Sequence, residues 1–425
     1  MNKKPKIAIL TIRNTYKYGG VFSVLKIAYE FCEKYFQPTV FSLSFDKEIS
    51  ASLRAFKFTS TTRPLTYFGM NCIEVGARWA FWEPGHYSFT IKHWQRLFAD
   101  YDYFFVVSAT PIAAHPLVQL DKKFALWMST PYLQDRTERI KELTKIPYLL
   151  SKITTPAMNK IEKKILERAS FIWAMSRYSK EQCEMILQKP KDNLAICGYP
   201  IDIKNNIKKI VPEGQVKEKV IIAVGRFTDP RKNISLLLTV FDKLYQQVPA
   251  LKLYVIGQPP LHEKITSFIS NPSFAHITFT GQVSPTELKR FYQKASLMLI
   301  TSYQEGFGIA GLEALAHGIP IVSTDCGGIK DFVLNDLTGY VVDIDDEIHM
   351  IEKALTILTN PELHKKMTQT AKIIVEENFS LEKIYSTLKY GFTKVYPDLT
   401  SWFAQNDQPL DHKIIKKINH ENISY

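Results

Sequence analysis

The sequence predicts an α/β protein built from two doubly wound halves, each with a parallel sheet between helices. Short apolar runs recur along both halves, and turn or helix signals follow each of them, as strands buried on both faces of a sheet require. A chain of 425 residues is long enough for two or three domains. The polar, turn-forming segment between Pro200 and Lys219 separates the halves. We therefore expect domains over residues 1–205 and 215–380, followed by a helix and tail over residues 381–425.

The first half opens with a strand and a glycine turn. The run from Ile7 to Ile12 is apolar, and Gly19-Gly20-Val21 opens a helical pattern that continues to about Phe36. Because glycine lets the backbone come close to a ligand, Gly20 is a candidate binding residue, with a plain turn as the alternative. Further strands are predicted over Thr39–Phe45, Tyr103–Ser108, Phe124–Met128 and Phe171–Met175, and a helix over Tyr178–Gln188.

The second half repeats the alternation of strands and helices. Gly257 and Gly281 each follow an apolar run directly, and ligands of open α/β sheets bind in the crevice at such strand ends. The predicted strands are Val220–Val224, Leu251–Ile256, Ile277–Thr280, Leu297–Thr301, Pro320–Ser323 and Tyr340–Val342. The predicted helices include Ile234–Val248 and Leu381–Val395.

One motif places two cations beside a predicted strand end. Val224-Gly225-Arg226-Phe227-Thr228-Asp229-Pro230-Arg231-Lys232-Asn233 follows the strand that ends at Val224 and precedes a helical pattern. Arg226 therefore lies at the carboxyl end of a strand, and Lys232 lies near the start of a helix. Two cations there suit a diphosphate, because charge-assisted hydrogen bonds are among the strong ones. The alternative is a pair of exposed surface cations.

A second motif places two carboxylates eight positions apart around a glycine turn. The stretch from Ser302 to Gly318 follows a strand-like run, and a helix-compatible run begins at about Ile309. A strand, a glycine turn and a helix start form an anion cradle, because the first helical turn leaves N–H groups unpaired. Glu305 and Glu313 can accept hydrogen bonds from hydroxyls on either side of a bound phosphate. The alternative is an amphipathic helix with solvated glutamates.

Together, these segments resemble the retaining glycosyltransferases of family 4, which have the GT-B architecture. That architecture has two Rossmann-like domains facing a cleft, with a C-terminal helix that crosses back to the first domain. The order Gly-Arg-Phe and Asp-Pro-Arg-Lys is similar to that of the phosphatidylinositol mannosyltransferases within the family. The resemblance runs from about Val220 to Asp343 and includes Thr324–Asp331 and Leu337–Val342.

The resemblance implies a role for each motif residue. Arg226 and Lys232 would hold the donor diphosphate, Glu305 would bind the hydroxyls of the donor sugar, and Glu313 would bind the ribose. Arg226, Lys232 and Glu305 are then the expected catalytic residues. The expected donor-binding set adds Gly20, Gly257, Gly306, Phe307, Gly308, Ile309 and Glu313.

The acceptor side departs from the family pattern. Many members have a histidine after a strand of the N-terminal domain, whereas here Ser129-Thr130-Pro131 follows the strand that ends at Met128. His115, Thr130 and Asp135 are the candidates to line the acceptor side. A lone loop histidine is more often structural, which is the alternative for His115.

A metal-binding role is not expected for the acidic run Asp343-Ile344-Asp345-Asp346. It resembles the metal motif of the other large glycosyltransferase fold, but it lies between a strand and a helical pattern. An aspartate there is a natural helix N-cap. We therefore expect no metal site and no cofactor, with the cationic pair taking the place of a metal.

Positive charge is concentrated in the first half. Residues 1–213 contain 32 Lys and Arg against 19 Asp and Glu, and residues Arg139–Ser170 contain eight cations and three carboxylates. Apolar residues alternate with these cations, which suits either an anionic membrane surface or a solvated helix with a buried stripe. No nucleic-acid-binding motif accompanies the charge.

The remaining features favour an intracellular protein. The five cysteines are scattered without metal-like pairing, no apolar run is long enough to span a bilayer, and the N-terminal apolar run is too short for a signal segment. We expect a cytoplasmic protein, peripheral on the inner face of the cell membrane. The expected partners are a nucleotide-diphosphate sugar, a glycan or lipid-linked acceptor, and no nucleic acid.

The expected activity is hexosyl transfer in cell-envelope polysaccharide or glycolipid synthesis, as the resemblance implies. Two alternatives belong to other classes. One is a nucleotide-sugar epimerase or a phosphorylase of the same fold, and the other is a non-enzymatic basic protein that binds a membrane surface.

Overall fold

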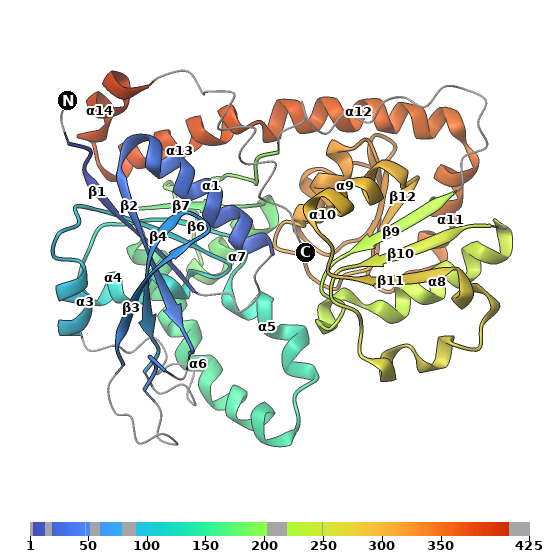
Figure 1. Ribbon diagram of the computed structural model, residues 1–425, viewed down its shortest axis with the longest axis horizontal. Helices are drawn as coiled ribbons and strands as arrows, with labels where there is room; N and C mark the ends of the chain where they lie inside the picture. The colour runs from blue at the N-terminus through green and yellow to red at the C-terminus, as the bar shows by residue number, and fades with distance from the viewer. Residues whose placement is uncertain are drawn as a thin grey trace. The chain divides into compact units, whose positions relative to one another are not determined.

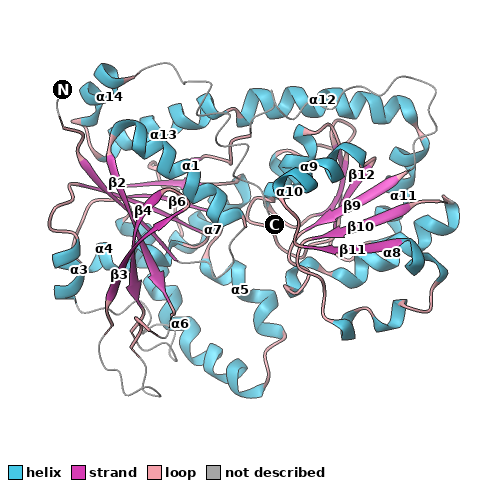
Figure 2. Ribbon diagram, viewed as in Figure 1, coloured by secondary structure: helices cyan, strands magenta, loops and turns pink. Residues whose placement is uncertain are grey.

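The computed structural model describes residues 3–12, 19–46, 48–51, 60–78, 91–201, 219–248 and 250–407. The chain forms two compact units, the first from Met1–Gly198 with Tyr385–Pro409 and the second from Tyr199–Ile384. Each unit contains a largely parallel sheet with helices against it (Figure 2). The predicted α/β class with two Rossmann-like domains is confirmed.

The sheet of the first unit has eight strands in the order β3-β4-β2-β1-β5-β6-β7-β8. All neighbouring strands pair in parallel except β3, which runs antiparallel to β4. The bounds are β1 Lys6–Ile12, β2 Gln37–Ser44, β3 Thr62–Tyr67, β4 Met70–Gly76, β5 Tyr103–Ser108, β6 Ala125–Met128, β7 Phe171–Ala174 and β8 Leu194–Ile196.

Helices cover the first sheet. One core cluster joins the sheet to the helices that follow β5, β6 and β7 and is lined by buried side chains such as Val106, Met128 and Ile165. The described helices before the second unit are α1 Gly20–Tyr35, α3 Ile91–Leu97, α4 His115–Gln119, α5 Tyr132–Lys141, α6 Lys145–Arg168 and α7 Arg177–Leu187, with a 3₁₀ turn Pro111–Ala114 before α4.

The last two helices, α13 Leu381–Val395 and α14 Leu399–Asn406, pack on the first unit (Figure 1). Phe392 of α13 stacks on Phe31 of α1 with ring centroids 5.7 Å apart. Gly391 permits the close approach of α13, since a Cβ there would lie 2.2 Å from Trp173 of β7. Aromatic packing therefore confirms the expected return of the C-terminal helix to the first domain.

The second unit has six parallel strands in the order β11-β10-β9-β12-β13-β14, which is the strand order of a dinucleotide-binding fold. Its strands are β9 Val220–Val224, β10 Lys252–Ile256, β11 Ile277–Gly281, β12 Leu297–Ile300, β13 Ile321–Thr324 and β14 Gly339–Val342. Its helices are α8 Ile234–Gln247, α9 Pro285–Lys294, α10 Ile309–Ala316, α11 Glu347–Thr359 and α12 Pro361–Phe379.

The predicted strands all exist, with ends that agree within about two residues. The hairpin of β3 and β4 was not predicted, because β3 alternates between half-buried and exposed residues and contains Pro64. The short edge strand β8 was also missed. The predicted linker between Pro200 and Lys219 falls mostly on residues 202–218, which lie outside the described residues.

Candidate functional site

The strand order of the second unit reverses between β9 and β12, and the candidate site lies at this reversal. Strands added after β9 lie on one side of it, whereas β12, β13 and β14 lie on the other. Because helices then leave on opposite faces, the loops after β9 and β12 diverge and leave a crevice where ligands bind. These loops, residues 225–233 and 301–308, contain most of the first motif and the start of the second motif that the sequence singled out.

Three glycines end adjacent strands and bring their loops together. Gly225 N–H donates to Ile256 O at 2.9 Å, and Gly257 N–H donates to Gly281 O at 3.0 Å. Gly257 has a φ of +114°, and a Cβ there would lie 2.1 Å from the carbonyl oxygen of Gly225. A side chain at position 257 is therefore excluded both by conformation and by space.

Lys232 and Glu305 form an ion pair that joins the two loops. Lys232 ends the 3₁₀ turn Pro230–Lys232, and its Nζ donates to Glu305 Oε1. The same carboxylate oxygen accepts from Ser302 Oγ at 2.8 Å. Burial raises the pKa of Glu305, but the charge and hydrogen bond of Lys232, the charge of Arg231 and the hydrogen bond of Ser302 together lower it by more, so that the net pKa is below the usual range. Glu305 is therefore ionised at neutral pH.

The backbone around Glu305 is fixed by two neighbouring loops. Glu305 N–H donates to Cys326 O at 2.6 Å, and Gly328 N–H donates to Glu305 O at 3.0 Å. On the other side, Tyr303 N–H donates to Arg231 O at 2.7 Å. The carboxylate is thus held in a preorganised position by the segments after β9 and β13.

The two arginines of the first motif have different surroundings. The Arg226 side chain is 40% exposed, with Nη2 3.9 Å from Asp229 Oδ2. Arg231 is only 11% exposed and bonds Asp229 Oδ2 at 2.8 Å and Gln304 Oε1 at 3.0 Å. Arg226 is therefore accessible to a ligand, whereas Arg231 holds the two loops together.

A glycine turn leads from Glu305 into α10. Phe307 is buried, and Gly308 is the N-cap residue with a φ of +86°. A Cβ on Gly308 would lie 2.3 Å from Ile329 Cδ1. Gly306, Gly308 and Ile309 thus place backbone N–H groups at a helix start, which is favourable for an anion.

Glu313 lies one turn inside α10 and is buried, with 4% exposed. Tyr292 Oη of α9 donates to Glu313 Oε2 at 2.9 Å. Burial and the charge of Glu313 raise the pKa of Tyr292 well above its usual range, so that it remains a donor. The ring of His317 stacks on Tyr292 with centroids 4.8 Å apart. The sequence did not single out Tyr292, because only the tertiary fold brings α9 against α10.

The predicted residues of the first unit have separate surroundings. Gly20 is the first residue of α1. His115 begins α4, and burial, followed by the charge of Lys164, lowers its pKa to about 4. Thr130 is buried after β6, where its N–H donates to Ala109 O at 2.9 Å. Asp135, in the first turn of α5, is paired with the guanidinium of the arginine one turn later at 2.8 Å.

The acidic run before α11 caps the helix, as the sequence predicted. Asp346 is the N-cap residue, and its carboxylate accepts from His349 N–H at 3.0 Å. Asp345 accepts from Asn233 Nδ2 at 2.8 Å. Within the described ranges, no group of three or more His, Cys, Asp or Glu residues is arranged to hold a metal ion.

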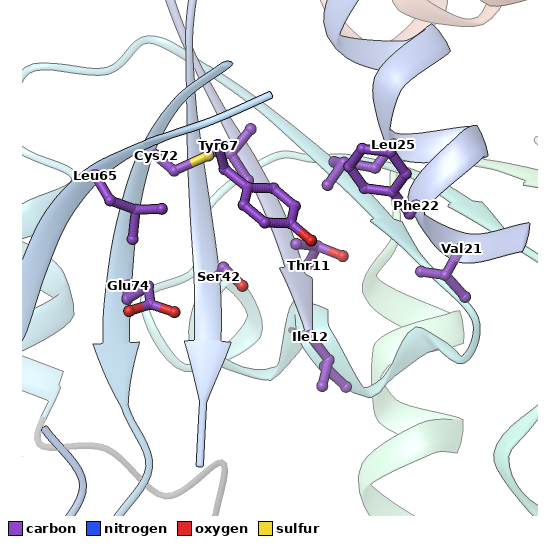
Figure 3. Close-up of a pocket in the computed structure, with 11 residues that line it drawn as sticks. Thr11, Ile12, Val21, Phe22, Leu25, Ser42, Leu65, Tyr67, Cys72 and Glu74 are labelled. Atoms are coloured by element: carbon purple, nitrogen blue, oxygen red, sulfur yellow. The ribbon is translucent and has the colours of Figure 1, made fainter. Parts of the chain in front are cut away.

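The first unit contains a pocket that the sequence did not predict. It has a volume of about 50 Å³ and lies between α1 and the sheet (Figure 3). Thr11 Oγ1 is buried in its wall and has no hydrogen-bond partner among the described residues. The walls are mostly apolar and consist of Thr11, Ile12, Val21, Phe22, Leu25, Val40, Ser42, Leu65, Tyr67, Cys72 and Glu74. Because β3 and β4 form one wall, the pocket was missed together with their hairpin.

Comparison with known proteins connects the second unit to sugar transfer. Residues 204–373 match the family "Glycosyl transferases group 1". The chain is 26% identical over 244 residues to N-acetyl-alpha-D-glucosaminyl L-malate synthase of Bacillus anthracis, covering 55% of this chain and 63% of that protein. It is 25% identical over 232 residues to poly(ribitol-phosphate) alpha-N-acetylglucosaminyltransferase of Staphylococcus aureus, covering 54% of this chain and 46% of that protein. The matched parts thus span less than two thirds of either relative.

Solved structures match nearly the whole chain. Sucrose-phosphate synthase of Thermosynechococcus elongatus superposes with a TM-score of 0.68 at 16% identity, covering 93% of this chain and 100% of that chain. HepE of Anabaena, in complex with UDP and glucose, superposes with a TM-score of 0.67 at 14% identity, covering 92% and 99%. The named relatives support a transferase enzyme. The chain has the GT-B fold, and the stretch that is similar to glycosyl transferases group 1, residues 204–373, lies in its second unit.

Proposed function

We propose that the protein is a retaining glycosyltransferase of family 4 that moves a sugar from a nucleotide-sugar donor to a glycan or lipid-linked acceptor. One observation carries the proposal. Lys232 and Glu305 meet at the strand-order reversal of the second unit, beside the accessible Arg226 and the start of α10. Cations, a fixed carboxylate and helix N–H groups in one place match the chemistry of a sugar diphosphate.

Each site residue has a distinct role in this proposal. Arg226 and Lys232 bind the diphosphate, and Glu305 accepts hydrogen bonds from the donor sugar. Glu313 lies about 6 Å along α10 from its first residue and binds the ribose hydroxyls. The backbone of residues 306–309 and of Gly257 approaches the donor, and neither Gly257 nor Gly308 has room for a side chain.

The chemistry rests on stabilising the leaving group. As the bond between the sugar and the diphosphate breaks, negative charge develops on the diphosphate oxygen, and Arg226 and Lys232 neutralise it. The acceptor hydroxyl attacks from the same face and gives its proton to the departing diphosphate oxygen, so that the anomeric configuration is retained. Groups aimed at developing charge commonly supply the largest catalytic term. In the proposed reaction these cations replace a divalent metal.

The names of similar proteins support the substrate class. HepE was crystallised with UDP and glucose, and two of the curated relatives are named for N-acetylglucosaminyl products or transfer. We place the reaction in cell-envelope polysaccharide or glycolipid synthesis on the cytoplasmic side of an anionic membrane. In this proposal the apolar pocket of the first unit takes a small apolar part of the acceptor.

Calorimetry tests the donor site directly. Wild type and Glu313→Ala are titrated with UDP, GDP and ADP, each with and without its common sugars and in the presence of EDTA. We expect micromolar binding of one nucleotide without metal, and at least about tenfold weaker binding in the variant because a buried carboxylate no longer pairs with the ribose. No binding by any nucleotide, or equal binding by both proteins, refutes the assignment. Conversion of the bound donor without any acceptor indicates an epimerase instead.

A further inference from the structure

The turn between α5 and α6 carries an exposed apolar surface. Every residue from 141 to 150 is exposed. We call residues 141–153 the α5–α6 tip, which extends away from the first sheet (Figure 1). Its large apolar side chains, with their exposed fractions, are Leu143 40%, Ile146 75%, Tyr148 38%, Leu149 60%, Leu150 53% and Ile153 66%. Contiguous exposed apolar side chains of this kind mark an interaction site.

Four of these exposed side chains share one face of α6. At 100° per residue, positions 146, 149, 150 and 153 fall within about 100° of one another. The buried face of the same helix, at Met158, Ile165 and Leu166, points about 140° away from that stripe. The N-terminal half of α6 therefore has its own apolar face, which does not belong to the core of the first unit.

The tip is built as a fixed element. Glu162 of α6 accepts a hydrogen bond from Tyr132 N–H at the start of α5 at 2.6 Å, and Glu162 itself is buried. This bond joins α5 to α6 near the sheet. The apolar stripe is thus presented at the far end of a braced helical hairpin.

Cations accompany the apolar stripe. Lys152 Nζ lies 4.8 Å from the ring centroid of Tyr148. Among the described residues, neither Lys145 nor Lys152 forms a salt bridge, whereas the carboxylate of Glu138 is paired with Lys141 at 2.7 Å. Residues 141–153 contain three lysines and one carboxylate, Glu142, so that the net charge of the tip is positive. Lysines beside an apolar stripe can keep their ammonium groups in the headgroup region while the apolar face is buried.

We propose that the α5–α6 tip binds the surface of a bilayer that contains anionic lipids. The apolar stripe enters the boundary between headgroups and acyl chains, and Lys145 and Lys152 contact lipid phosphates. No helix in the described ranges is long and apolar enough to cross a membrane. The inference deepens the proposed function by naming the surface that would bring the enzyme to a membrane-associated acceptor.

Vesicle flotation of the full chain tests this inference without any donor. The tip variant is Ile146→Glu with Leu149→Glu and Ile153→Glu. Its matched control is Ile348→Glu with Ile373→Glu and Met185→Glu, three residues with similar exposed fractions of 78%, 56% and 68%. Wild type and control are expected to float with vesicles of phosphatidylcholine and phosphatidylglycerol. The tip variant is expected to bind at least about tenfold more weakly, because carboxylates replace its inserted side chains.

A charge variant separates the two parts of the interaction. Lys145→Glu with Lys152→Glu is expected to lose the preference for phosphatidylglycerol over pure phosphatidylcholine, and added salt is expected to weaken wild-type binding. Circular dichroism checks that each variant is folded, and nucleotide calorimetry checks the donor site separately. Equal flotation of wild type and tip variant overturns the inference, as does the absence of wild-type flotation. A wild-type dimer that the tip variant dissociates, without vesicle binding, identifies the tip as a self-association surface instead.

Discussion

Replacing Lys232 by methionine tests the central ion pair of the candidate site. Methionine keeps an unbranched stem beside Gly225, whose hypothetical Cβ would lie 3.0 Å from Lys232 Cε, and removes the ammonium charge together with its hydrogen bond to Glu305. Preorganised groups at developing negative charge are typically worth 10²–10³ in kcat, or about 2.7–4 kcal/mol. We therefore expect transfer to the identified acceptor to fall by about that factor.

The same change is expected to destabilise the fold in a pH-dependent way. Breaking a fully buried ion pair costs about 3–5 kcal/mol of unfolding free energy. The side chains of Lys232 and Glu305 are 20% and 17% exposed, and solvent screening therefore reduces the expected loss to about 1–3 kcal/mol. In wild type the lowered pKa of Glu305 contributes stability above the unfolded carboxyl pKa of about 4.3, and this stability is lost as the pH falls through the folded pKa. Without Lys232, the pKa of Glu305 loses the charge and the hydrogen bond that oppose burial most, so that it rises and less of this stability remains at neutral pH.

Urea unfolding between pH 4.5 and 7 and steady-state kinetics measure the two effects. Lys353→Met is the control, because Lys353 pairs with the half-exposed Glu352 at 3.0 Å on α11; it should change stability by less than about 1 kcal/mol and leave turnover unchanged. Folded Lys232→Met with transfer within threefold of wild type would refute the role of this residue. An unchanged pH slope would refute the electrostatic account of Glu305.

Three other perturbations have expected outcomes. Tyr292→Phe removes the buried 2.9 Å hydrogen bond to Glu313. Calorimetry should then show about tenfold weaker nucleotide binding, and urea unfolding should show a loss of about 1–3 kcal/mol in the free energy of unfolding. Unchanged nucleotide binding would contradict a role of Tyr292 in positioning Glu313. Gly257→Ala would place a Cβ 2.1 Å from a backbone oxygen, and thermal unfolding should show a loss of at least about 2 kcal/mol in the free energy of unfolding. Gly281→Ala is the control, because Gly281 has a φ of +70° but open space around it, and the loss should be only about 1 kcal/mol. Burial holds the pKa of His115 near 4, so the contribution of neutral His115 to the free energy of unfolding is present above pH 6.5 and is lost as the pH falls toward 4, by at most about 3 kcal/mol. His115→Gln should therefore flatten the plot of unfolding free energy against pH between about pH 6.5 and 4. An unchanged plot, measured by urea unfolding, would place His115 in solvent.

The sequence by itself determined the parallel sheets and the loops that carry the candidate site. Buried parallel strands must be continuously apolar, and Val220–Val224 and Leu297–Ile300 are. The loops after such strands lie at the carboxyl end of the sheet, which placed Arg226 and Glu305 there from the sequence alone. Local chemistry was equally informative at Asp346, where an aspartate before a helix became its N-cap.

The tertiary structure alone decided which side chains meet. The pairing of Lys232 with Glu305 spans 73 positions, and the contact of Tyr292 with Glu313 depends on how α9 lies against α10. The α5–α6 tip shows the same limit, because periodicity reveals that α6 is amphipathic but not that Ile146 and Ile153 face solvent. Apolar spacing specifies a helix face, whereas long-range packing decides whether that face is covered by the protein or left for a partner.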